Sequence, residues 1–269
     1  QQTSGKTNLS RTVPTLSLNG ALFFERDSQF FDSHYLHTLE PQLFYVYTPF
    51  SNQSDFPIFD TSVRGFDVNN FTTDNRFNGI DRIGDDNRLT TALATRFINQ
   101  ENGSELMMAR IGQIHYFSDR EVQLGNSIDK SSSSNIITEA QFSPGKWKLL
   151  SQITWDSEFE QKLSSSNQLN YQNSKFGANL AQRFQINALE TREINMNWTF
   201  NSRWQFNLTN LYDVRNDHVI ENLLGVNYES CCWGLRLSAK SRYLSPTQTD
   251  TGVYIELILK GLGGVGVSN

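Results

Sequence analysis

The sequence lacks any long hydrophobic run, and this absence limits the fold classes open to it. Its 269 residues have a mean hydropathy of −0.49. No stretch approaches the roughly 18 uncharged apolar residues of a transmembrane helix. A transmembrane β-barrel leaves no such stretch, because only alternate residues of each strand face lipid. The composition therefore excludes a helical membrane protein and is compatible with a soluble β protein or an outer-membrane barrel.

Basic residues are not in excess either, and the formal net charge is −5. A basic face is the first requirement of a nucleic-acid-binding protein, so we expect no nucleic-acid partner. The sequence begins at Gln1 without an initiating Met or the apolar region of a signal peptide. Since a secreted or outer-membrane protein enters through such a signal, we expect the natural N-terminus to lie further upstream.

Cysteine is scarce: only Cys231 and Cys232 are present, side by side. Adjacent cysteines are poorly placed to bond to each other, because a disulfide normally joins Cα atoms about 4.4–6.8 Å apart. Two interpretations stay open. The thiols bond to partners outside this sequence, which favours an oxidising compartment and a longer polypeptide, or they are free or buried thiols without a partner.

Helical periodicity is nearly absent, and alternation with a period of two recurs. In the clearest segment, 193–200, every second residue is large and apolar, and polar residues fill the positions between them. Many such runs reach the roughly 9–11 residues that a tilted strand needs to cross a bilayer. We predict about thirteen strands, over residues 12–25, 35–49, 88–100, 105–118, 135–143, 146–157, 165–173, 176–186, 190–200, 203–214, 219–230, 232–243 and 251–263.

The connections between these strands alternate between short turns and longer loops. This alternation is typical of a barrel with short periplasmic turns and longer extracellular loops, and it predicts Cys231 and Cys232 near the periplasmic face. Two connections depart from the rule, since 187–189 is short and 26–34 is long. The predicted longer connections are 50–87, 119–134, 158–164, 187–189, 215–218 and 244–250.

The two faces of each strand differ in chemistry. One face is rich in Gln, Asn, Thr, Glu and Arg, and the other often ends in Trp, Tyr or Phe, as expected where rings anchor at membrane interfaces. A barrel would turn the polar face to its lumen and the apolar face to lipid. A soluble β-sandwich, in which the apolar face meets another sheet, is the alternative for the fold.

Several segments, distributed over nearly the whole chain, carry a further signal. They are Leu39–Phe50, Phe59–Thr61, Asp74–Asp85, Leu224–Trp233 and Ile255–Gly263. They include a loop with the sequence Asn-Arg-Phe and a Cys-Cys pair. In sequence and in order, these segments resemble the LptD family of lipopolysaccharide-assembly outer-membrane proteins.

The resemblance implies an all-β fold, an antiparallel transmembrane β-barrel. Residues 1–269 would be its C-terminal part, about 13 strands of a larger barrel of about 26. The N-terminal periplasmic jellyroll and the first barrel strands would be absent from this sequence.

The resemblance also implies a function. The full protein would insert lipopolysaccharide into the outer leaflet of the bacterial outer membrane, through the barrel lumen and a lateral gate. Its partners would be lipopolysaccharide, outer-membrane lipid, the plug lipoprotein LptE inside the barrel, and the periplasmic bridge protein LptA, reached through the missing jellyroll. No cofactor, metal or enzyme activity is expected. A general outer-membrane porin or receptor barrel is the alternative function.

Three groups of residues take a role from the resemblance. Cys231 and Cys232 would form disulfides with the absent N-terminal region. The last strand, about 251–263, would form one side of the lateral gate, with Val253, Ile255, Leu257, Leu259, Gly261 and Gly263. An extracellular loop motif, which would fold over or into the barrel mouth, comprises Asp74, Asn75, Arg76, Phe77, Asp81 and Arg82.

The sequence gives little support for a calcium site or a hydrolase. The carboxylates of 74–86 lack the spacing of a calcium loop, so a loop with surface ion pairs is favoured over a calcium site. His115 near Asp119, and His218 near Asp217, could be offered as the base of a barrel hydrolase. No Gly-x-Ser-x-Gly nucleophile turn accompanies them. The glycine-rich C-terminus is expected to be either a weakly pairing strand or a tail that leaves the sheet.

Overall fold

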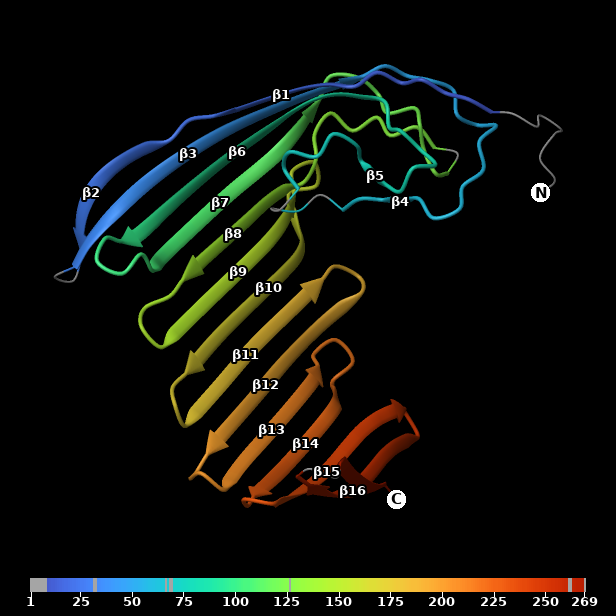
Figure 1. Ribbon diagram of the computed structural model, residues 1–269. Helices are drawn as coiled ribbons and strands as arrows, with labels where there is room; N and C mark the ends of the chain where they lie inside the picture. The colour runs from blue at the N-terminus through green and yellow to red at the C-terminus, as the bar shows by residue number, and fades with distance from the viewer. Residues whose placement is uncertain are drawn as a thin grey trace. The chain divides into compact units, whose positions relative to one another are not determined.

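The computed structural model describes residues 9–30, 33–65, 67, 70–125, 127–260 and 263–268. Its strands are β1 (Leu16–Ala21), β2 (Phe24–Phe30), β3 (Ser33–Thr48), β4 (Ser62–Val63), β5 (Phe77–Asn78), β6 (Asp86–Asn99), β7 (Glu105–Tyr116), β8 (Ile136–Phe142), β9 (Trp147–Asp156), β10 (Gln161–Gln172), β11 (Phe176–Gln185), β12 (Leu189–Thr199), β13 (Trp204–Asp213), β14 (His218–Glu229), β15 (Trp233–Ser245), β16 (Gln248–Leu259) and β17 (Gly263–Ser268). Figure 1 shows the strands in chain order.

One antiparallel sheet contains nearly all of these strands. Its order is β1-β3-β6-β7-β8-β9-β10-β11-β12-β13-β14-β15-β16-β17, with β2 also paired to β3, and β4 and β5 form a separate two-stranded sheet. The predicted all-β antiparallel architecture is confirmed. Among the described residues, no helix is long and apolar enough to span a bilayer.

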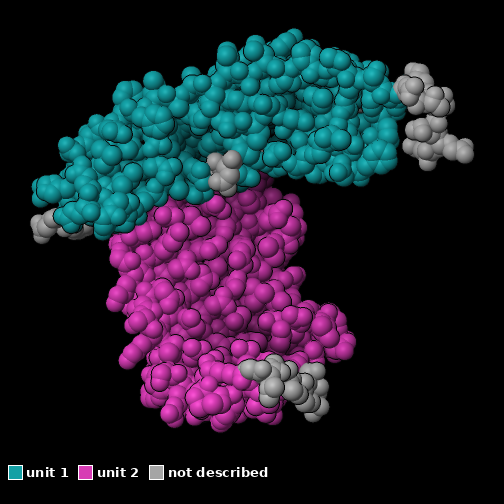
Figure 2. Space-filling model, in the orientation of Figure 1, with its two compact units in different colours: residues 1–139, 154–161 teal, residues 140–153, 162–269 magenta. Residues whose placement is uncertain are grey.

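The chain divides into two compact units, coloured separately in Figure 2. Unit 1 comprises Gln1–Glu139 and Thr154–Gln161, and unit 2 comprises Ala140–Ile153 and Lys162–Asn269. In unit 2, β11 to β16 are joined by the short connections 186–188, 200–203, 214–217, 230–232 and 246–247. In unit 1, by contrast, the connections 49–85 and 117–135 are long.

Period-two alternation produces the predicted two-faced strands in unit 2. Trp198 pairs with Phe206 and Met196 pairs with Leu208, while Asn197 between them pairs with Asn207. Large apolar side chains therefore gather on one face, which we call the apolar face, and amide and charged side chains gather on the other, the polar face. The apolar face is solvent-accessible over a wide area, with Leu224 56% and Val253 62% exposed.

The N-terminal strand region lies further along the chain than the prediction of 12–25, because β1 begins at Leu16 and β2 ends at Phe30. β1 and β2 pair with β3 in a single register, since Ala21 faces Gln42 and Phe24 faces Leu39. The interruption falls opposite Pro41, which accepts a hydrogen bond from Leu22 N at 3.0 Å but has no N–H to donate in return. The expected long turn over 26–34 is therefore wrong, because β2 continues to Phe30.

The C-terminal prediction is also corrected. Residues 251–263 do not form one final strand: β16 ends at Leu259, and Gly263 begins β17, which pairs back onto β16. The glycine-rich segment is thus a paired strand and not a tail, and Gly261 lies outside the described residues. The predicted loops 158–164 and 244–250 are shorter than expected, because β10 begins at Gln161 and β16 at Gln248.

Candidate functional site

The long connections of unit 1 fold against the polar face of β3, β6 and β7. Arg88 on β6 donates a hydrogen bond to the carbonyl oxygen of Thr73. Phe71 covers Gly112 of β7 so closely that any Cβ at that position would collide with its ring. Val46, which pairs with Arg88 on the same face, is fully buried. The core of unit 1 therefore lies between these connections and the sheet.

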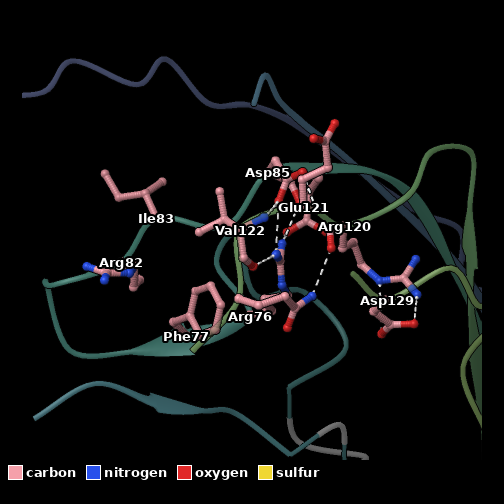
Figure 3. A network of polar contacts seen from close by, with 12 residues as sticks. Arg76, Phe77, Arg82, Ile83, Asp85, Arg120, Glu121, Val122 and Asp129 are labelled. Carbon is pink, nitrogen blue, oxygen red and sulfur yellow. Dashed lines mark hydrogen bonds and ion pairs between the residues drawn. The ribbon is translucent and has the colours of Figure 1, made fainter. Parts of the chain in front are cut away.

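The centre of this arrangement is the ion pair between Arg76 and Asp85, shown in Figure 3. Arg76 Nη2 lies 2.9 Å from Asp85 Oδ1, and Arg76 also donates to the carbonyl oxygen of Val122. Asp85 accepts hydrogen bonds from the backbone N–H groups of Glu121, at 2.7 Å, and Val122, at 2.9 Å. The pair thus ties 49–85 to 117–135.

A second buried cation, Arg120, organises the connection 117–135. Its guanidinium lies 2.6 Å from Asp129 Oδ1 and 3.5 Å from the centre of the Tyr116 ring, and it donates to Ser131 O at 3.0 Å. Arg120 is only 2% exposed. Because a buried charge is costly unless it is paired, these contacts are needed to keep the connection folded.

Asp81 holds the segment that precedes the loop motif. Its Oδ2 accepts hydrogen bonds from the backbone N–H groups of Phe59 at 2.8 Å, Asp60 at 3.0 Å and Thr61 at 3.3 Å. The hydrogen bonds from Phe59 and Asp60 are the main cause that lowers the pKa of Asp81 to about 2. The carboxylate form is therefore the one that fits this turn.

The other motif residues fall into two groups. Asn75 accepts from Gly84 N at 3.0 Å and donates to Arg82 O at 3.2 Å, and so closes the turn between them. Arg82 donates to Phe56 O at 2.8 Å, and the Phe77 side chain is 2% exposed. Asp74 is exposed and stands outside this network. The motif residues thus mainly fix the conformation of the connection to which they belong.

Beyond Phe71, a groove of about 240 Å³ continues along the polar face of unit 1. Phe23 and Phe71 border it together with charged side chains. Arg96 pairs with Glu40 at 3.2 Å and with Glu105 at 2.7 Å. The groove therefore combines apolar rings with fixed charges. In the described part of the chain, no cluster of three or more His, Cys, Asp or Glu side chains could hold a metal ion.

The two cysteines occupy the turn between β14 and β15. Their Sγ atoms are 2.8 Å apart, beyond the roughly 2.05 Å of a disulfide bond, and both residues are exposed. The hydrogen bond that the two thiols share lowers the pKa of Cys231 and raises the pKa of Cys232.

The residues predicted for the gate separate into two strands. Val253, Ile255, Leu257 and Leu259 alternate along the apolar face of β16 and are all exposed. Gly263 lies on β17, where it pairs with Leu259. The structure therefore brings these residues together at a hairpin and not on a single edge strand.

Comparison with known proteins identifies the family of this chain. The family model described as LPS transport system D matches residues 1–222. The chain belongs to the LptD family. The family resemblance predicted from the loop motif and the Cys-Cys pair is confirmed, and the chain is part of an outer-membrane β-barrel.

Curated members of the LptD family align along almost the whole chain. The LPS-assembly protein LptD of Nitrosococcus oceani is 36% identical over 96% of this chain and 36% of its own length. That of Legionella pneumophila subsp. pneumophila is 31% identical over 99% of this chain and 36% of its own length. The chain thus spans about a third of the length of these relatives.

Among solved structures, a mutant of the Rh. blastica porin matches with a TM-score of 0.36 and 10% identity, over 96% of this chain and 93% of that one. This similarity is too low to support an inference about the LptD-family chain.

Several contributors to the site were not predicted from the sequence. Arg120, Val122 and Asp129 belong to a connection in which only a serine-rich loop was expected, and the contact of Phe71 with Gly112 was not anticipated. The nearest signal was the unusual density of charge in 119–130, because charged residues are almost never buried unless they are paired.

Proposed function

We propose that this chain forms the C-terminal wall of an outer-membrane barrel that inserts lipopolysaccharide into the outer leaflet. The observation that carries this proposal is the family match over 1–222. The two-faced strands of unit 2 support it, because the polar face suits an aqueous lumen and the exposed apolar face suits lipid.

The chemistry of the substrate fits such a wall. The sugars and phosphates of lipopolysaccharide are best solvated along a polar face. Its acyl chains gain about 0.8 kcal/mol for each CH₂ that stays in hydrocarbon. A path that begins in the lumen and leaves sideways through the barrel wall satisfies both halves of the molecule.

For the lateral exit, we place one side of the gate at the β16–β17 hairpin. Opening a seam exposes unpaired backbone groups to lipid, which is costly, and weak pairing lowers that cost. Gly263, Gly264 and Gly266 of β17 support this placement, since glycine weakens strands. A disulfide that staples β17 to the first strand of the full barrel should block delivery of lipopolysaccharide. Normal delivery by the stapled protein would contradict the placement of the gate.

The cysteines and the partners complete the proposal. Exposed thiols at one turn suit disulfides to an N-terminal periplasmic region, and an oxidising periplasm would preserve such bonds. That region would receive lipopolysaccharide from the bridge protein LptA, and the lipoprotein LptE would fill the lumen. In the full-length protein, a change of Cys231→Ser together with Cys232→Ser should abolish the mobility difference between reduced and non-reduced gels.

The proposal is tested with a photo-reactive residue in the full-length protein, in its own outer membrane. At Asn227, on the polar face, we expect a crosslink to lipopolysaccharide that disappears when its supply is stopped. At the neighbouring Val226, on the apolar face, we expect mainly phospholipid. An open channel for small solutes, without any lipopolysaccharide adduct at Asn227, would instead support a general porin.

A further inference from the structure

A row of uncharged polar side chains crosses the apolar face of unit 2. We call Asn210, Asn222, Ser241 and Thr251 the polar row. They lie one on each of β13 to β16 and are paired in register, Asn210 with Asn222, Asn222 with Ser241, and Ser241 with Thr251. The alternation that makes this face apolar elsewhere is therefore broken at the same level on four consecutive strands.

The polar row is not simply the place where the strands reach water. Two residues away on one side lie the apolar side chains Leu208, Leu224, Ala239 and Val253, which are also in register. Two residues further on the other side, β13 carries Tyr212 and β15 carries Tyr243. The polar row thus lies between a band of apolar side chains and these two tyrosines.

Hydrogen bonds within the polar row leave capacity for a ligand. Asn210 Nδ2 donates to Asn222 Oδ1 at 2.7 Å, and Thr251 Oγ1 donates to Ser241 Oγ at 3.5 Å. Each amide has two N–H donors and two acceptor positions, and one bond uses only a fraction of these. Asn222 and Thr251 are exposed. A polar group that faces hydrocarbon without a hydrogen-bond partner is unfavourable. The unused donors and acceptors of the polar row would therefore be stabilised by a polar ligand.

The face is hollowed at this level. A shallow cavity of about 460 Å³ is lined by apolar and polar-row residues, including Leu208, Leu224, Ala239 and Ser241. The neighbouring charged residue Lys240 points to the opposite, polar face, where the Lys240 Nζ atom lies 3.1 Å from Glu221 Oε2. The polar row itself contains no cation that would favour a phosphate.

We infer that the polar row holds the junction between sugar and acyl chain of a glycolipid in the outer leaflet. Sugar hydroxyls and the acyl linkage would bond to the two amides and two hydroxyls, and an acyl chain would lie on Leu208, Leu224 and Ala239. This inference rests on the proposed function, which makes lipopolysaccharide the glycolipid. It adds a binding site on the apolar, lipid-facing side of the barrel wall, where newly delivered lipopolysaccharide would lie.

The first test places a photo-reactive residue at Leu224, beside the polar row, in the full-length protein in its own outer membrane. The matched control is the apolar Leu180, which lies at the level of the polar row but is separated from Asn210 by Ile194. We expect the adduct with lipopolysaccharide at Leu224 to exceed that at Leu180 by about fivefold, the factor that one neutral hydrogen bond is worth. Equal yields, an adduct with phospholipid only, or an adduct with a protein would overturn the inference.

A second measurement separates recognition from folding. With the photo-reactive residue at Leu224, which leaves the polar row intact, Asn222→Leu should lower the lipopolysaccharide adduct about fivefold, and the conservative Asn222→Gln should retain it. An unchanged yield in Asn222→Leu would refute the inference. If Asn227 on the polar face still yields the adduct while these positions do not, the inference fails and the proposed function stands. If Asn227 yields none, the proposed function fails as well.

Discussion

The two units use similar ion pairs in different surroundings. In unit 1, Arg76 and Asp85 meet where the connections 49–85 and 117–135 come together, with side-chain exposures of 12% and 6%. In unit 2, Arg236 and Glu256 meet on the polar face of β15 and β16, with exposures of 53% and 40%. The pairs have similar lengths, 2.9 and 3.1 Å. Burial, and not distance, therefore decides what each pair contributes.

This difference separates two tasks. A buried pair that also accepts backbone N–H groups fixes one loop conformation, because breaking it leaves an uncompensated charge. An exposed pair is screened by water and leaves its groups available to other partners. The polar face of unit 1 is therefore covered by folded connections, whereas the ion pair on the polar face of unit 2 stays accessible to water.

The largest effect should follow the loss of the buried carboxylate. Asp85→Ala removes the partner of Arg76 and the acceptor for two backbone N–H groups, and it should destabilise the folded connections by about 3–5 kcal/mol. Proteolysis within 49–85 or 117–135 should accelerate accordingly. Glu256→Ala, the control in unit 2, should cost no more than about 1 kcal/mol. If Asp85→Ala and Glu256→Ala resisted proteolysis to a similar extent, the contrast between the units would be refuted.

A smaller effect should follow from crowding beneath Phe71. In Gly112→Ala the new Cβ collides with the Phe71 ring, and overpacking of this kind costs about 1–3 kcal/mol. Hydrogen exchange at 71–73 should accelerate, and adding Phe71→Ala should relieve the collision. Gly20→Ala is the control, because nothing lies within 4 Å of that position. No change in exchange would show that Phe71 does not anchor the connection.

The pH dependence should be the mildest of the three effects. The pKa of Asp81 is lowered from 3.8 to about 2, so its contribution to loop stability is complete above the unfolded value and is lost as the pH falls through about 2. Exchange at Phe59, Asp60 and Thr61 should therefore report an intact turn at pH 5 and a loosened one near pH 2. Asp81→Asn should loosen the turn at both values. If the acid transition persisted in Asp81→Asn, a group other than Asp81 would be its cause.

The strands of unit 2 could be predicted because their information is local. Alternation in β12 and β13 places Trp198, Phe206 and Leu208 on one face without reference to any distant residue. β2 was missed because its sequence, with Arg26 and Asp27, is polar, and only the partner strand β3 makes it extended. β17 was not among the thirteen predicted strands, because glycine carries no pattern, although a weakly pairing strand was one of the two expectations for this segment.

The candidate site of unit 1 shows where local information ends. Asn75 and Arg76 could be singled out from the loop motif, but their partners could not. Asp85 meets Val122 only because two separate connections fold onto the same face, and Phe71 finds Gly112 for the same reason. Such contacts depend on loop conformation and leave no periodic trace in the sequence.

The most direct test of the account is a scan of accessibility along β13. Spin labels at successive positions from Trp204 to Thr209, in the full-length protein in a bilayer, should alternate with a period of two. Labels at Trp204, Phe206 and Leu208 should collide mainly with oxygen dissolved in lipid. Those at Gln205, Asn207 and Thr209 should collide mainly with a water-soluble nickel reagent. Alternation in the opposite phase, or none, would contradict the claim that the apolar face meets lipid.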